Sequence, residues 1–64
     1  MNTQLARLSD VKKLLLERAQ RHLDAAMRCT HYENRKIFME KAEALIDAAR
    51  DVEMLGREVA LENN

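Results

Sequence analysis

The 64-residue sequence predicts an all-α fold: an antiparallel helical hairpin, two copies of which form a four-helix-bundle-like homodimer. Two observations support helices over strands. The chain has no proline and one glycine, which favours long helices, and its apolar residues recur at helical spacing in two stretches. A third observation is a short segment between these stretches that carries helix-start signals. Hydrophobic residues make up 47% of the chain, which excludes a chain disordered by composition.

The first helix is predicted over residues 3–28. When each residue advances by about 100°, the apolar side chains of this stretch fall within about 140° of arc. They are Leu5, Leu8, Val11, Leu15, Leu16, Ala19, Leu23 and Ala26. Opposite charges four residues apart, such as Lys13 and Glu17, add a little helix stability. Leu14 lies outside the apolar stripe, among polar residues.

The turn is predicted at about residues 29–33. Thr30 followed by Glu33 has the form of a capping box, in which side chains satisfy the free backbone N–H groups of a helix start. Asn34 is an alternative N-cap residue. Because no glycine or proline enforces a reversal here, a single continuous helix is the alternative.

The second helix is predicted over about residues 34–61. Phe38, Leu45, Val52 and Val59 recur every seven residues, with Ala48 and Leu55 between them, which is typical of a coiled-coil-like seam. Gly56 is expected inside the helix, because Val59 keeps the register beyond it. The residues predicted to form the hairpin core and the dimer contact are Leu8, Leu15, Ala19, Leu23, Phe38, Leu45, Ala48, Val52, Leu55 and Val59.

The charge distribution favours antiparallel packing of the two helices. Residues 1–32 hold six basic and three acidic side chains, whereas residues 33–64 hold five basic and eight acidic ones. Folding the chain back at the turn places the basic residues Arg7, Lys12 and Lys13 beside the acidic residues Glu58, Asp51 and Glu53, and Leu8 near Leu55. Opposite charges and complementary sizes therefore meet in the same register.

A homodimer is expected because a chain this small seldom builds a sufficient core alone. Each apolar stripe is too wide for one neighbouring helix, and Leu14, Met39 and Ile46 would stay exposed on a single hairpin. Cys29 is the only cysteine, which excludes an intrachain disulfide and suits a reducing compartment. Two hairpins packed face to face would cover the remaining apolar surface.

We expect no metal, no cofactor and no enzymatic activity. His22 and Cys29 would lie about 10.5 Å apart along a helix, too far to bind one ion together. Cys29 and His31 would point apart, and no glycine-rich loop offers an oxyanion site for nucleophilic catalysis.

The expected location is the cytoplasm, without membrane contact. Charged residues such as Arg7, Asp10 and Lys12 occupy the place of a signal peptide's apolar region. The longest apolar run is three residues, too short to span a bilayer.

Two surfaces are candidates for binding a macromolecule. A host protein is the first choice, and its contacts would involve Leu14 and the acidic residues Glu40, Glu43, Asp47 and Asp51. RNA or DNA is the alternative, bound by the basic face of the first helix through Arg7, Arg18, Arg21 and Arg28. A purely structural assembly subunit is a third interpretation.

Two resemblances bear on these expectations. The hairpin arrangement resembles the Rop-type dimeric helical hairpins, plasmid regulators that form four-helix bundles and bind RNA. The segments MNTQLARLSDVKKLLLERAQ and RKIFMEKAEALIDAARDVE resemble the small early-region accessory proteins of lambdoid phages. The second resemblance implies a host-directed role during infection, in the host cytoplasm, that favours protein–protein contact. Neither resemblance assigns a role to a particular residue.

Overall fold

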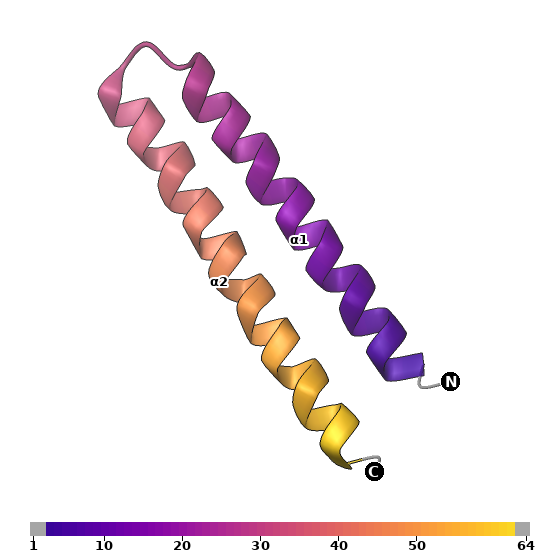
Figure 1. The fold of residues 1–64 in the computed structure, drawn as a ribbon. Helices are drawn as coiled ribbons and strands as arrows, with labels where there is room; N and C mark the ends of the chain where they lie inside the picture. The colour runs from indigo at the N-terminus through magenta and orange to yellow at the C-terminus, as the bar shows by residue number, and fades with distance from the viewer. Residues whose placement is uncertain (1–2, 63–64) are drawn as a thin grey trace.

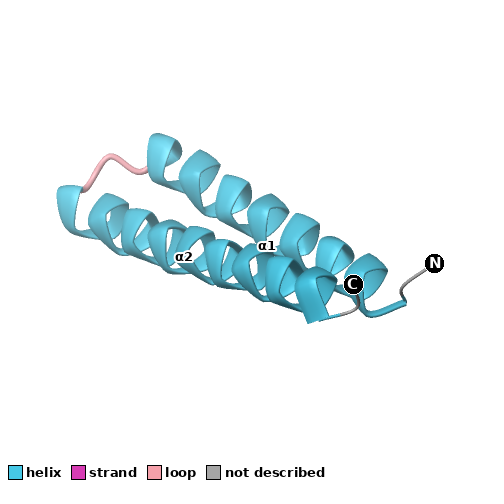
Figure 2. Ribbon diagram, turned by 60° about the horizontal axis from the view of Figure 1, so that its bottom comes forward, coloured by secondary structure: helices cyan, strands magenta, loops and turns pink. Residues whose placement is uncertain are grey.

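A computed structural model describes residues 3–62 as two helices joined by a short turn. Helix α1 spans Thr3–Arg28 and helix α2 spans Tyr32–Glu62. The helices run antiparallel, with the turn at one end of the molecule and both chain ends at the other (Figure 1). The all-α prediction and the helical hairpin are confirmed. Figure 2 shows the two helices side by side in a single layer.

Helix α2 begins earlier than the sequence suggested, and its start is built differently. The carbonyl of His31 accepts a hydrogen bond from the Arg35 N–H over 3.1 Å, which makes His31 the N-cap residue. A capping box at Thr30 and Glu33 requires Thr30 at that position. The predicted capping box is therefore wrong.

A backbone bond and one arginine close the turn. The N–H of Cys29 donates to the carbonyl of Ala26 over 3.2 Å, which tightens the last turn of α1. The guanidinium of Arg35 then donates from Nη2 to the carbonyl of Cys29 over 2.9 Å. Because this carbonyl lies just beyond the α1 C-terminus, the bond ties the start of α2 to the end of α1.

Alanines form the seam between the helices. The buried hydrophobic residues are Ala19 and Ala26 on α1, which are 2% and 4% exposed, and Ala42 and Ala49 on α2, which are 0% and 2% exposed. Each pair is seven residues apart, so each keeps the same side of its helix toward the other helix. Small side chains let the helices approach closely, and no large side chain is fully buried within residues 3–62.

Gly56 extends this seam toward the chain ends. Helix α2 continues through it to Glu62, as expected, and Gly56 does not have a positive φ. A Cβ atom built on Gly56 would lie 3.9 Å from Cδ2 of Leu5, at ordinary contact distance. Leu5 and Gly56 therefore lie at the same height in the hairpin, which fixes the register near the termini.

The hairpin is long and thin. Its Cα atoms extend over 50 × 15 × 9 Å, and the radius of gyration is 14.9 Å, compared with about 11 Å for a compact domain of this length. The accessible surface is 5366 Å², whereas a compact protein of 7.4 kDa exposes roughly 4,200 Å². A single layer of helices leaves both broad faces open.

Candidate functional site

One broad face of the hairpin carries apolar side chains along most of its length. With residues advancing by about 100°, the same side of the alanine seam receives residues from both helices. We call this the Leu45 face and define it by Leu8, Val11, Leu15, Phe38, Leu45, Val52, Leu55 and Val59. Most are half-buried, while Val11 and Leu55 are 45% and 47% exposed.

The Leu45 face changes character from the termini to the turn. Near the termini both helices present aliphatic side chains, among them Leu8, Val11 and Val52. The groove between the helices there is lined mainly by such side chains, together with Gln4 and Arg7. Near the turn, by the same spacing, it also carries Arg18, His22 and Lys41. The apolar half of the face therefore lies toward the termini.

Phe38 organises part of the turn half. The His22 ring stacks on the Phe38 ring with centroids 6.1 Å apart and an interplanar angle of 27°. The ammonium of Lys41 lies 5.9 Å from the centroid of the same ring, within cation–π range. These polar groups use the ring as a partner and keep the turn half of the face partly polar.

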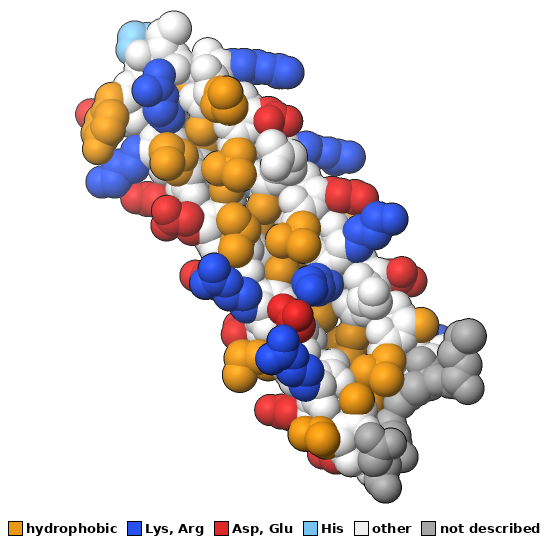
Figure 3. All heavy atoms as spheres, in the orientation of Figure 1, with side chains coloured by type: hydrophobic (Ala, Val, Ile, Leu, Met, Phe, Trp, Pro, Cys, Tyr) orange, Lys and Arg blue, Asp and Glu red, His pale blue; other side chains and the backbone are white. Residues whose placement is uncertain are grey.

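On the opposite broad face of the hairpin, the apolar side chains lie mainly near the turn. We call it the Met39 face and define it by Leu16, Leu23, Met27, Met39 and Ile46. A groove of about 500 Å³ near the turn is lined by Gln20, Leu23, Ala26, Met27, Arg35 and Met39. Figure 3 shows such a face, with hydrophobic side chains gathered between the helices in the half nearer the turn, charged side chains crossing the face beyond them, and further hydrophobic side chains toward the termini.

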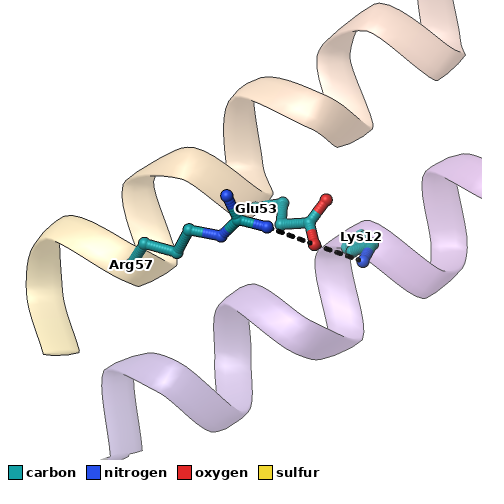
Figure 4. A network of polar contacts seen from close by, with 3 residues as sticks. All are labelled: Lys12, Glu53 and Arg57. Atoms are coloured by element: carbon teal, nitrogen blue, oxygen red, sulfur yellow. Dashed lines mark hydrogen bonds and ion pairs between the residues drawn. The ribbon is translucent and has the colours of Figure 1, made fainter.

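An ion-pair network occupies the terminal half of the Met39 face. Glu53 Oε1 lies 3.5 Å from Lys12 Nζ on α1, and 3.5 Å from Arg57 Nη2 on α2 (Figure 4). The contact between Lys12 and Glu53 joins the helices in the register that their charges predicted. Because the side chains of Lys12 and Glu53 are 37% and 43% exposed, this contact fixes register more than it stabilises the fold.

The acidic candidates lie together on α2, but Leu14 does not join them. Glu40, Glu43, Asp47 and Asp51 are all exposed, on the side of α2 that faces away from α1. Glu40 lies 4.0 Å from Lys36 and Asp47 lies 3.8 Å from Arg50, both within α2. Leu14 is 48% exposed on the outer edge of α1. A single hairpin therefore does not make one surface of these residues.

Three of the basic candidates, Arg7, Arg21 and Arg28, form a row on the outer edge of α1, and Arg18 lies on the Leu45 face. Arg7, Arg18, Arg21 and Arg28 are exposed, and within residues 3–62 none of them forms an ion pair. Neither Glu43 nor Asp51 of α2 has an ion pair with a described residue. Unpaired cations are thus concentrated on α1, and unpaired carboxylates are found on α2.

The predicted core residues have three positions in the hairpin. Ala19 is buried in the seam and Leu55 is exposed, so Leu55 is not a core residue of the single chain. The others are half-buried beside the seam: Leu8, Leu15, Leu23, Phe38, Leu45, Ala48, Val52 and Val59. Ala26, Ala42 and Ala49 complete the seam and were missing from the predicted core. Their seven-residue spacing with Ala19 and Gly56 was the signal that could have found them.

Within residues 3–62, no group of three or more His, Cys, Asp or Glu side chains is placed to hold a metal ion. In the same part of the chain, neither helix is long and apolar enough to cross a membrane. Cys29 is a half-buried free thiol beside the turn.

Comparisons with protein-family models, curated proteins and solved structures find no match to this chain. The resemblances to Rop-type hairpins and to lambdoid phage proteins therefore stay predictions.

Proposed function

We propose that this chain is a non-enzymatic cytoplasmic protein that forms a homodimer and acts by binding another protein, as a phage or plasmid accessory regulator does. The observation that carries the proposal is surface area. The single hairpin exposes 5366 Å², about 1,200 Å² more than a compact chain of its mass. One partner in a standard-size interface buries about 800 Å². A second copy would therefore cover about two thirds of this excess.

The exposed surface is also apolar in the way an interface requires. Ten large apolar side chains in the described part of the chain are between 42% and 83% exposed. They are Val11, Leu14, Leu16, Met27, Tyr32, Ile37, Met39, Met54, Leu55 and Leu61. Where such side chains are contiguous, as on the Leu45 face, they favour an interaction surface.

Sedimentation equilibrium tests the dimer directly. At micromolar concentration we expect a mass twice the 7.4 kDa of one chain, and a thermal midpoint that rises with concentration because association favours the folded state. A stable, fully helical monomer at the same concentration would contradict the homodimer.

The acidic side of α2 is the proposed surface for the partner protein. Glu43 and Asp47 are exposed and project away from α1, so a partner with a basic surface can approach them in either the monomer or the dimer. Affinity capture from bacterial lysate, with and without nuclease, should retain a protein whose binding is lost with Glu43→Lys and Asp47→Lys together. The variant should keep wild-type helicity, so that the loss reports the surface and not the fold.

Nucleic-acid binding is the second candidate, favoured by the unpaired arginines of α1. Arg7, Arg21 and Arg28 lie on one edge, with Arg18 on the neighbouring Leu45 face, and a dimer would present two such rows. A steep loss of RNA or DNA affinity with salt, together with sensitivity to Arg18→Ala and Arg21→Ala, would support this alternative. Capture that disappears after nuclease treatment would also favour it over a protein partner.

A further inference from the structure

We infer that the second copy docks on the Leu45 face with both turns at the same end, so that α1 of each copy lies against α2 of its partner. This inference rests on the proposed homodimer and adds its interface and orientation. A symmetric pair of hairpins packed face to face has two possible arrangements. In the first, the turns lie at the same end and α1 of each copy packs on α2 of the other. In the second, the turns lie at opposite ends, so that α1 packs on α1 and α2 packs on α2.

The uneven Leu45 face favours the same-end arrangement. Contacts of Lys12 with Glu53 and of His22 with Phe38 show which residues of α1 and α2 lie at the same position along the long axis of the hairpin. When both turns are at the same end, a residue of α1 faces, across the interface, the same α2 residues of the partner subunit that lie beside it in its own chain. Val11 then meets Val52 of the partner subunit, and Leu8 meets Leu55 of the partner subunit, so the apolar halves cover each other.

The opposite-end arrangement places unlike halves in contact. Reversing one copy puts Val11 near Arg18 of the partner subunit and Leu8 near His22 of the partner subunit. Burying arginine or histidine against aliphatic side chains without a polar partner costs free energy. At each end of the bundle, the apolar terminal half of one copy would then face the partly polar turn half of the other. The same-end arrangement has fewer such contacts: Arg18 falls level with Leu45 of the partner subunit, but His22 falls level with the polar Lys41 of the partner subunit.

Side-chain size and charge agree with the same-end arrangement. Leu14 falls level with the small side chain of Ala48 of the partner subunit, and Ile37 falls level with Ala25 of the partner subunit. Arg7 comes near Glu58 of the partner subunit, and neither residue has an ion pair with a described residue in its own chain. Opposite ends would instead bring arginines of α1 toward those of the other α1.

The size of the face is sufficient for a stable pair. The Cα atoms of the hairpin extend over 50 Å by 15 Å across its broad side, a flat area of roughly 750 Å² for each copy. The side chains add further accessible surface to this area. Specific interfaces bury about 800 Å² per partner. The same-end dimer would also move Leu14 into the interface between copies, leaving Glu43 and Asp47 for another protein.

The native cysteine provides the experiment. Nitroxide labels on Cys29 would sit beside the turn of each copy, and pulsed dipolar electron resonance measures their separation. With turns at the same end, the two α1 axes are diagonal neighbours about 14 Å apart, and the label distance should be short. With turns at opposite ends it should be about 40 Å, since the 26 residues of α1 rise about 1.5 Å each.

The outcomes separate the inference from the proposed function. A short distance supports the same-end dimer, and a distance near 40 Å overturns it while leaving the homodimer intact. Monomeric mass with no dipolar signal overturns the homodimer itself. A dimer that Leu16→Lys disrupts and Val11→Lys does not would overturn the choice of face.

Charge reversal is an independent second measurement. In the same-end dimer, Arg7→Glu places a carboxylate near Glu58 of the partner subunit. The dimer dissociation constant should therefore rise by about fivefold, as for exposed charge pairs. Adding Glu58→Lys to the same chain should restore the wild-type value. Lys13→Glu, on the other side of α1, is the matched control and should change little. With turns at opposite ends, Arg7→Glu would leave dimerisation unweakened.

Discussion

The two broad faces of the hairpin both carry large apolar side chains, but they arrange them in opposite directions along the helices. The Leu45 face is aliphatic near the chain termini and mixes in Arg18, His22 and Lys41 near the turn. The Met39 face is apolar near the turn and is crossed by the Lys12–Glu53–Arg57 network near the termini. Only the Leu45 face has a seven-residue apolar repeat that runs the length of α2.

This difference shows that exposure alone does not identify an interface. Val11 on the Leu45 face and Leu16 on the Met39 face are 45% and 42% exposed, which is nearly equal. What separates them is the surface around them: Val11 continues an apolar surface, whereas Leu16 lies beside Lys12 and Lys13 in a charged rim. Continuity of apolar area decides where a second copy gains the most free energy.

The largest expected effect comes from a charge at the centre of the Leu45 face. Leu45→Asp should unfold the protein, because a carboxylate would be buried without a partner at a cost of about 3 kcal/mol or more. We expect the variant to lose both its helicity, measured by circular dichroism, and its dimer mass, measured by sedimentation.

Met39→Asp is the comparison for this variant. Met39 is 44% exposed and its replacement leaves the Leu45 face intact, so the protein should remain helical and dimeric with a modest loss of stability of about 1 kcal/mol. A Leu45→Asp protein that stays helical and dimeric would show that the core has been assigned to the wrong face.

A smaller effect is expected from paired lysine substitutions at exposed sites. Val11→Lys places an ammonium in the proposed interface once per copy and should raise the dimer dissociation constant about 100-fold, at roughly 1.4 kcal/mol per site. Leu16→Lys, at almost equal exposure on the same helix, should change it by less than about threefold. Equal effects of the two variants would remove the distinction between the faces.

The sequence was sufficient for the fold because periodicity and composition act locally. The absence of proline, the apolar spacing of both stretches and the charge imbalance predicted two antiparallel helices. The contact between Lys12 and Glu53 joins one member of each of the two charge groups expected to face each other. The capping box failed because cap choice depends on tertiary geometry. Arg35 bonds the Cys29 carbonyl, and His31 becomes the N-cap in place of Thr30.

The role of each apolar repeat was harder to assign. Phe38, Leu45, Val52 and Val59 were predicted as the seam, but large side chains keep helices apart, and the alanines allow a closer approach. The small-residue repeat therefore faces the other helix, and the large-residue repeat moves to a broad face. Sequence alone does not choose between two repeats of the same period, since both satisfy the same helical spacing.

Gly56→Ala should sharpen the comparison by strengthening the fold without altering either face. Glycine in a helix interior costs about 0.5–1 kcal/mol relative to alanine, and the new methyl group would meet Leu5 Cδ2 at 3.9 Å, an ordinary contact distance. The free energy of unfolding in urea, at fixed chain concentration, should rise by that amount. A loss of stability would mean that the seam is tighter near the termini than the contact with Leu5 indicates.

The smallest expected effect concerns the charges that interrupt the Met39 face. Glu53→Gln keeps the shape of the side chain but removes its charge from both Lys12 and Arg57. The loss should be below about 1 kcal/mol, because the distances of 3.5 Å and the exposed fractions are those of weak surface pairs. The difference from wild type should disappear in 1 M salt, where screening acts over about 3 Å. Glu43→Gln, which has no ion pair with a described residue, should have no such salt dependence. A double-mutant cycle that combines Glu53→Gln with Lys12→Gln isolates the contact between the two helices. A coupling free energy well above 1 kcal/mol between these two residues would mean that this network is desolvated, and therefore that the terminal half of the Met39 face is covered by a partner.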